Sequence, residues 1–255
     1  MLILASIDYV SKGVELKRTL CVLGLTLVVT LVVAGCVKAV DTKTEEVSPT
    51  PMAITDSMDK KIELAKTGGM MIFAYQPAEG DVFKGITVQT KEPSKTFSWS
   101  TTINPTYYPT ITVGDFYTGG KDEIAIILTK GYGTGILQQE LHVLKKEDLS
   151  EILVENPIIA IKKNVKSKIT KGDKTVTVEL EANGMKFKKE YKKSAAGTWN
   201  ENVAFGDIVQ FIIDKNKITA HLPGAVSPAP EIVATAVAEY GKDLKINKVD
   251  LIEEK

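Results

Sequence analysis

The 255-residue sequence is poor in the residues on which phosphate and nucleic-acid sites depend. Arg18 is its only arginine, and 32 basic residues are balanced by 32 acidic ones, giving a formal net charge of +0. The planar guanidinium of arginine is the usual group for two-point hydrogen bonding to phosphate. A chain without net charge also has no long-range field that attracts polyanions. We therefore expect no nucleic acid among the partners of this protein.

Cysteine and histidine are scarce as well, with two of each in the sequence. Cys21 lies within an apolar run, and Cys36 lies just after the end of that run. Two histidines leave little material for a zinc centre or a Ser-His-Asp arrangement. No serine stands in a G-x-S-x-G sequence. These absences favour a protein that is not an enzyme.

The N-terminal segment has the features of a secretory signal peptide. Lys12, Lys17 and Arg18 precede an apolar run at residues 19–33, which is followed by small residues. A basic start, a short apolar run and small residues at a cleavage point are typical of such a signal. The run is shorter than the roughly 20 residues of a spanning helix. A membrane-anchoring helix that is not cleaved is the alternative.

The sequence Val33-Ala34-Gly35-Cys36 resembles the lipobox of bacterial lipoproteins. The resemblance implies that residues 1–35 are removed as a signal peptide and that Cys36 becomes the first residue, carrying acyl chains such as palmitate. It also implies a protein outside the cytoplasm, anchored by lipid to a bacterial membrane. Asp8 and Glu15 are unusual in such a leader, which leaves open a later translation start.

Residues 36–57 are predicted to be the lipidated cysteine and a flexible tether. The segment after Cys36 is rich in Thr, Ser, Glu and Pro and has no hydrophobic period. Such a composition cannot bury enough apolar surface to offset the entropy of ordering the chain. A tether of about 20 residues would separate the lipid from the folded part.

Strand-type alternation of apolar and polar residues dominates the sequence after the tether. Val176, Val178 and Leu180 share one face of a predicted strand, and Asn183-Gly184 follows them. Asn-Gly is the strongest short hairpin signal, because both turn positions require positive φ. The sequence therefore predicts an all-β protein of mainly antiparallel sheets, with few or no long helices beyond the signal segment.

Two further hairpins and one helical turn are predicted. The first hairpin spans residues 208–222 and turns at residues 214–217, and the second spans residues 232–252 and turns at residues 241–243. The second also has apolar residues at helical spacing, so a helix is the alternative there. A capping-box sequence at residues 148–151 predicts a single turn of helix.

The folded part is expected to contain two β regions. A boundary is predicted near Asn156-Pro157, between residues 58–155 and a second region, residues 156–255, which begins with a lysine-rich stretch. Proline pushes its predecessor into an extended conformation. In the first region, residues 124–128 are a continuous apolar run bounded by turns, which fits a strand buried on both faces.

Residues 110–144, which contain the sequence GDFYTGGKDEIAII at residues 114–127, resemble one FG-GAP or VCBS-type repeat, the blade unit of integrin-like β-propellers. Uncharacterised bacterial lipoproteins carry this repeat too. The first and last acidic calcium ligands of the family match Asp115 and Glu123, but two intervening ligand positions hold Tyr117 and Gly119. Calcium needs about 6 to 8 oxygen ligands. The resemblance thus implies a degenerate calcium loop, and we expect no cofactor, with weak calcium binding as the alternative.

Only one good copy of this repeat is present in the sequence. A propeller needs several blades, which would be visible as internal repeats. We therefore expect a β-sandwich or two packed sheets that contain one blade-like unit.

Two pairs of residues are candidates for functional sites. Tyr117 and Tyr132 are expected at the surface, where they would contact a ligand such as a glycan or a peptide. Glu140 and His142 lie two residues apart on one predicted strand and therefore share a face. They form either an acid–base pair or part of an exposed polar face.

These features predict a lipid-anchored extracytoplasmic binding or interaction module of the bacterial cell envelope. Its partners would be the membrane, through the N-terminal lipid, and an unknown envelope protein or glycan. A surface hydrolase that acts on envelope glycans or peptides through Glu140, His142 or Asp115 is one alternative. A weak calcium-dependent adhesion module is the other.

Overall fold

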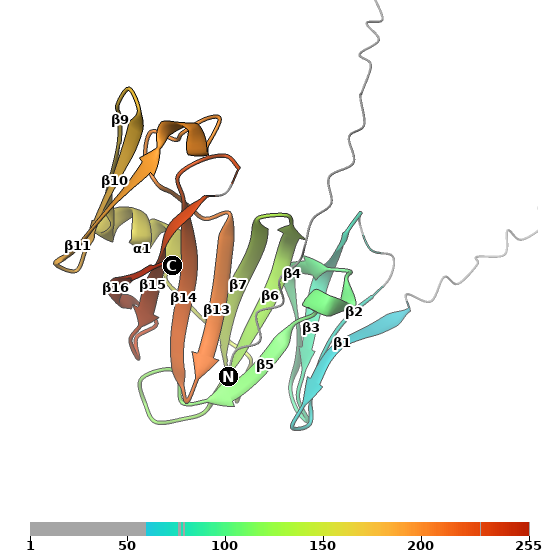
Figure 1. The fold of residues 1–255 in the computed structure, drawn as a ribbon. Coiled ribbons are helices and arrows are strands. Elements are labelled where there is room, and N and C mark those ends of the chain that lie inside the picture. Colours follow the sequence, from blue (N-terminus) through green and yellow to red (C-terminus); the bar gives the residue numbers. More distant parts are fainter. Residues whose placement is uncertain (1–59, 76–77, 79, 230, 255) are drawn as a thin grey trace, which may run out of the picture. The chain divides into compact units, whose positions relative to one another are not determined.

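The computed structural model describes residues 60–75, 78, 80–229 and 231–254 (Figure 1). The chain divides into two units, Met1–Ile54 and Thr55–Lys255, and all described residues belong to the second. The predicted signal peptide, Cys36 and the whole predicted N-terminal tether lie outside the described residues, as does every residue up to 59. Among the residues that are described, no helix is long and apolar enough to cross a membrane.

The first sheet has four antiparallel strands that follow one another in chain order. They are β1 (Lys61–Thr67), β2 (Met70–Tyr75), β3 (Val82–Gln89) and β4 (Ser94–Thr102). Apolar side chains of this sheet, among them Ile72, Ile86 and Trp99, form a shared core with residues of the second sheet.

The second sheet has nine strands, and its main path runs in the order β16-β15-β14-β13-β7-β6-β5. The two short strands β8 and β12 pair with β7 and β14. Neighbouring strands are antiparallel except β7 and β13, which run parallel. The nine strands are β5 (Thr110–Gly114), β6 (Glu123–Gly133), β7 (Ile136–Lys145), β8 (Glu151–Ile152), β12 (Ala204–Phe205), β13 (Ile208–Asp214), β14 (Lys217–Ala225), β15 (Ile232–Tyr240) and β16 (Ile246–Glu253).

The third sheet has three antiparallel strands in the order β11-β10-β9 (Figure 1). These are β9 (Lys166–Lys171), β10 (Thr175–Ala182) and β11 (Met185–Lys192). The helix α1 (Pro157–Asn164) precedes β9, and two single 3-10 turns lie at Pro105–Tyr107 and Lys193–Ala195.

The predicted hairpins are confirmed. Asn183 and Gly184 have φ angles of 49° and 76° and connect β10 to β11. Lys215 and Asn216 also have positive φ and connect β13 to β14. β15 and β16 pair over residues 234–253, so the alternative of a helix in this region is wrong.

The predicted helical turn at residues 148–151 is wrong. Leu149 has a φ of 54° and is fully buried, and the backbone N–H of Ser150 donates a hydrogen bond to Asp148 Oδ1. This turn leads directly into β8. Burying a leucine side chain contributes roughly 1.5–3 kcal/mol, which exceeds the ~1 kcal/mol typical of a helix cap. Packing of Leu149 therefore decides the local conformation.

The helix begins instead at the predicted region boundary. Asn156 is extended, as expected before proline, and its Oδ1 accepts hydrogen bonds from the backbone N–H groups of Ile158 and Ile159. A capping asparagine followed by proline in the first turn is a favourable helix start. Strands from both sides of Asn156-Pro157 share the nine-stranded sheet.

β6 is buried on both faces, as the apolar run at residues 124–128 predicts. Ile124, Ile126 and Leu128 pack in the core shared with the four-stranded sheet. Ala125 faces a second core, on the opposite side of the sheet, to which α1 and β13–β16 contribute. The prediction of a mainly antiparallel all-β protein with packed sheets is confirmed.

Candidate functional site

The predicted calcium loop is held in shape by Glu123 itself. This side chain is only 4% exposed, and its Oε2 accepts hydrogen bonds from the backbone N–H groups of Phe116 and Tyr117 at 2.8 and 2.9 Å. Hydrogen bonds from backbone N–H groups to an ionised carboxylate are stronger than those between neutral groups. The carboxylate of Glu123 therefore closes the loop through the backbone.

Asp115, at the other end of the loop, is paired with a lysine. Its Oδ2 lies 2.8 Å from Nζ of Lys242, and the same ammonium donates a hydrogen bond to the backbone carbonyl of Asp115. Asp115 Oδ1 is buried without a hydrogen-bond partner among the described residues. In the described part of the chain, no group of three or more His, Cys, Asp or Glu side chains could hold a metal ion. The cationic partner of Asp115 is thus the ammonium group of Lys242.

The structure does not bring Tyr117 and Tyr132 together. Tyr117 lies before the start of β6 and Tyr132 near its end, and this strand has 11 residues that each rise about 3.3 Å. Tyr117 packs against the core next to Phe116. Tyr132 is 40% exposed and stacks on Tyr107 with ring centroids 4.5 Å apart. The two predicted ligand-binding residues therefore belong to separate surfaces.

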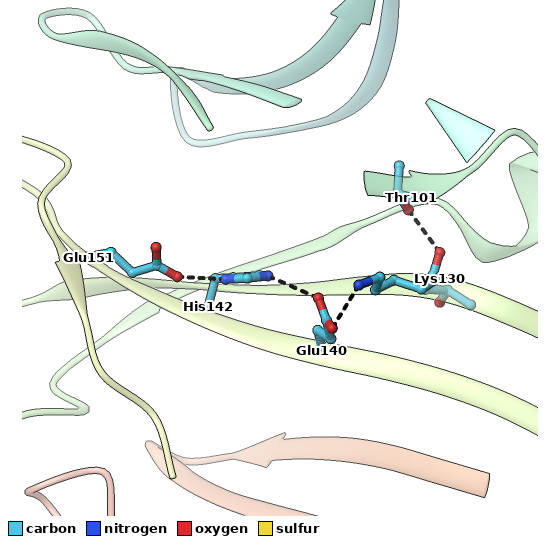
Figure 2. A network of polar contacts seen from close by, with 6 residues as sticks. Thr101, Lys130, Glu140, His142 and Glu151 are labelled. Atoms are coloured by element: carbon cyan, nitrogen blue, oxygen red, sulfur yellow. Dashed lines mark hydrogen bonds and ion pairs between the residues drawn. The ribbon is translucent and has the colours of Figure 1, made fainter. Parts of the chain in front are cut away.

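Glu140 and His142 do form a polar cluster, together with Glu151 of β8 and Lys130 of β6 (Figure 2). His142 Nδ1 lies 2.6 Å from Glu151 Oε1. His142 Nε2 lies 3.7 Å from Glu140 Oε2, which is close enough for an ion pair but too long for a hydrogen bond. Glu140 Oε1 accepts a hydrogen bond of 2.9 Å from Lys130 Nζ.

Strand pairing explains how these side chains meet. The register between β6 and β7 shifts between Thr129 and Gly131, so Lys130 lies in an irregularity of the ladder. Such bulges re-aim the side chain of the extra residue. The backbone nearby is held by Thr101 of β4, whose hydroxyl donates to the carbonyl of Thr129 (Figure 2). The turn around Leu149 returns the chain so that β8 places Glu151 beside β7.

An aromatic stack also fixes the position of the His142 imidazole. The ring of His142 stacks on Trp99 of β4, with centroids 3.9 Å apart, and Trp99 stacks on Phe97, also at 3.9 Å. Only 13% of the His142 side chain is exposed. The four-stranded and nine-stranded sheets therefore meet at His142, and the ring is held both by packing and by Glu151.

The cluster changes the acidity of Glu140. The imidazole of His142, followed by the ammonium of Lys130, lowers the pKa of Glu140 from 4.5 to about 2. Glu140 is therefore an ionised carboxylate over the whole range of ordinary pH.

We expect Glu140 to contribute to acid unfolding. Because its pKa is lower in the folded protein, its stabilising contribution is present above pH 4.5 and is lost as the pH falls from 4.5 towards 2. The Glu140→Gln variant should lose less stability than the wild type over this interval, measured as urea midpoints across the pH series. Glu92→Gln, at an exposed carboxylate elsewhere, is the control. Identical acid dependence of Glu140→Gln and wild type would contradict the assignment.

Next to this cluster, the nine-stranded sheet opens between β7 and β13. The two strands pair at only two positions, Leu137 with Ile208 and Gln138 with Val209. Beyond these pairs a side chain replaces the backbone ladder, because Gln139 Oε1 accepts a hydrogen bond from the N–H of Phe211 at 2.8 Å. β8 pairs with β7 from Val143 onward. Within the described structure, residues 139–142 have no strand partner on this edge of β7.

A groove of about 560 Å³ occupies this opening. It is lined by residues 138–142 of β7, by residues 151–158 and by Val209 and Phe211 of β13. Successive residues of a strand point to opposite faces, so a lining of five consecutive residues means that the groove borders the strand edge. Its volume is within the roughly 300–1,000 Å³ range of ligand sites. Leu153, which is 88% exposed, forms part of the wall.

The sequence pattern finds two members of this cluster and misses the others. Glu140 and His142 are detectable because they share one face of a strand. Glu151 and Trp99 are not detectable in this way, since each lies on a strand other than that of Glu140 and His142. Gln138 lies on the same face of β7 as Glu140 and His142. This spacing is the only local sequence signal that the polar surface continues along the strand.

Comparisons of the chain with protein-family models, curated proteins and solved structures find no match. The resemblances of the sequence around Cys36 to a lipobox and of residues 110–144 to a single repeat stay predictions. An assignment of function therefore depends on the residues and contacts described above.

Proposed function

We propose that this protein is a non-catalytic binding module, anchored by lipid at Cys36 on the outer side of a bacterial membrane, that takes an extended peptide segment of an envelope protein into the groove beside β7. The observation that carries the proposal is the open edge of β7 at residues 139–142. The anchor and the location are supported by the lipobox-like sequence alone.

An open strand edge is suited to an extended peptide. Its backbone N–H and C=O groups pair with a further strand, which gives affinity, while side chains along the groove give specificity. Leu153 and Val154 offer apolar contact on one wall, and Gln138 offers polar contact on the other. The groove thus combines a backbone ladder with mixed side-chain chemistry.

The aromatic residues beside the groove favour a peptide over a glycan. Trp99 reaches the site through His142, but one face of its ring is covered by Phe97 and the other by His142. Only 9% of Trp99 is exposed. Trp99 therefore offers no open ring face on which a sugar would stack.

The same contacts support binding over hydrolysis. Glu140, with a pKa of about 2, is a poor proton donor at neutral pH. His142 is held between Glu151 and Trp99. The lining residues of the groove include no serine, threonine, cysteine or lysine nucleophile, and the carboxylate of Glu140 is engaged by Lys130.

Site-specific photocrosslinking of the full chain in its native membrane tests the peptide ligand. A crosslinking amino acid at position 153 is expected to capture a defined segment of an envelope protein, identified by mass spectrometry. The matched control is position 159, because Ile159 is 66% exposed but does not line the groove. Leu153→Lys should reduce capture from a second probe at position 138, whereas Ile159→Lys should not.

Equal capture at positions 153 and 159 would overturn the proposed peptide groove. Turnover of an envelope glycan or peptide by the wild type that is lost in Glu140→Gln would replace the binding role with the hydrolase alternative. Either result leaves the lipid anchor to be decided separately.

A further inference from the structure

The neutral total charge conceals a strong separation of charge within the folded unit. Residues 162–193 contain eleven lysines and four acidic residues, so that 11 − 4 gives a formal charge of +7. The other described residues contain 15 lysines and 20 acidic residues, so that 15 − 20 gives −5. The positive part coincides with the end of α1 and the three-stranded sheet β9–β11.

The strand register places four of these eleven lysines in two rows on one face of the sheet. The central strand β10 places Glu181 between two lysines and Glu179 between two more, in rows across the three strands. The two rows are Lys166-Glu181-Lys186 and Lys168-Glu179-Lys188. Residues two apart on a strand share a face, so both rows lie on the same side.

The opposite face of this sheet is buried. Ile169, Val178 and Leu180 pack in a core with residues of β15, among them Val233 and Ala234. The lysine face is therefore fixed in its orientation and all four lysines of its rows are exposed. A hollow of about 420 Å³ lies along the two rows.

Two of these four lysines have no ion-pair partner in the part of the chain that the structure describes. Lys166 and Lys188 form long ion pairs with Glu181 and Glu179, at 3.7 and 3.5 Å. Lys168 and Lys186 have no ion-pair partner among the described residues. Exposed pairs of this kind are weak, so the whole face is available to an external anion.

We propose that the lysine face, Lys166, Lys168, Lys186 and Lys188, docks on the anionic phospholipid headgroups of a membrane surface. The charge of residues 162–193 is complementary to such a surface, and lysines near an anionic bilayer are attracted to it within about a Debye length.

The proposed lipid anchor makes this docking efficient, and to that extent the inference rests on the proposed function. A flexible tether of about 20 residues has a mean end-to-end distance of roughly 25 Å. The folded unit would therefore stay close to the bilayer at high effective concentration. The lysine face would then decide which side of the unit lies against the lipid and which side is left open to partners.

Lysine footprinting of the full chain in vesicles tests the inference. The protein is incorporated into vesicles of phosphatidylcholine alone, or of phosphatidylcholine with phosphatidylglycerol, and vesicle-bound protein is acetylated and analysed by mass spectrometry. We expect Lys168 and Lys186 to be acetylated about fivefold more slowly on the anionic vesicles, and molar salt to abolish the difference. Lys91 and Lys215, exposed outside this sheet, are the controls and should not change.

Equal acetylation on the two kinds of vesicle, or equal slowing of Lys91 and Lys215, would overturn the docking. A third sample replaces the anionic lipid with soluble inorganic polyphosphate. Protection by polyphosphate without protection by anionic vesicles would also overturn it, because the occupant would then be a soluble polyanion. Failure of the anchor is a distinct result, visible as an unmodified Cys36 in the same mass spectra.

Discussion

Replacing Cys36 by serine should move this protein from the membrane fraction into the soluble fraction of cells that produce it. In the proposed function the acylated thiol is that of Cys36, and serine cannot form the thioether that would carry the acyl chains. Stable attachment generally needs more than one acyl chain, so the loss of the diacylated thioether is expected to release the chain almost completely, provided that the leader is still removed. Fractionation followed by mass spectrometry of the N-terminal peptide measures both the location and the modification.

Cys21→Ser is the matched control for this prediction. Both substitutions replace a thiol by a hydroxyl, but Cys21 lies within the apolar run and should leave with the leader. This variant is expected to remain anchored and acylated. A wild-type protein that keeps residues 19–33 and carries no acyl chain on Cys36 would instead favour the alternative of a helix that is not cleaved.

Replacing Glu123 by alanine is expected to have the largest effect on stability. The change leaves the backbone N–H groups of Phe116 and Tyr117 without their carboxylate acceptor. Each buried donor left unsatisfied costs about 1–3 kcal/mol, so a total near 3 kcal/mol is expected. For a domain of this size that lowers Tm by roughly 6–12 °C. Glu123→Gln keeps an acceptor oxygen without the charge and should fall between alanine and wild type.

The control for Glu123 is its exposed neighbour Asp122, whose change to alanine should leave Tm unaltered. Differential scanning calorimetry with and without calcium separates the two interpretations of the loop. If Glu123 acts through the backbone, the ranking of the variants is the same with calcium and with a chelator. A rise in Tm of the wild type with calcium, absent in Glu123→Gln, would contradict this interpretation and support the adhesion alternative.

The local part of the fold is accessible from the sequence, because its signals lie within a few residues of one another. Asn183-Gly184 specifies its own turn through positive φ, and the alternation in β10 then sets which face is buried. The same holds for β13 and β14, where Asn216 lies in the turn. The capping-box signal at residues 148–151 fails for a reason that is not local, since Leu149 packs into the core that the four-stranded and nine-stranded sheets share.

The site is accessible only in part, because its members come from distant strands. His142 and Glu140 are found together since they are two residues apart. Trp99 lies 43 positions before His142, and their stacking depends on how the two sheets face each other. The opening between β7 and β13 depends on a parallel pairing between strands about 70 residues apart. No local sequence pattern predicts this pairing.

The distribution of charge over the surface is also only partly predictable from the sequence. A net charge of +0 predicts no long-range electrostatic field around the protein. The absence of nucleic acid among its partners stays a prediction. The lysine face is visible only when the register of β9, β10 and β11 is known, because the register brings lysines from β9 and β11 together on one face.

The short parallel junction between β7 and β13 also bears on how the folded unit would report on an occupant. Two residue pairs and the hydrogen bonds of Leu137, Gln138 and Gln139 with residues 206–211 form this junction, so the backbone ladder is short at the middle of the nine-stranded sheet. A peptide lying against β7 would lengthen the ladder at this junction and couple the stiffness of the whole sheet to occupancy. A peptide bound at β7 would then make the rest of the nine-stranded sheet more rigid, without any rearrangement of the strands.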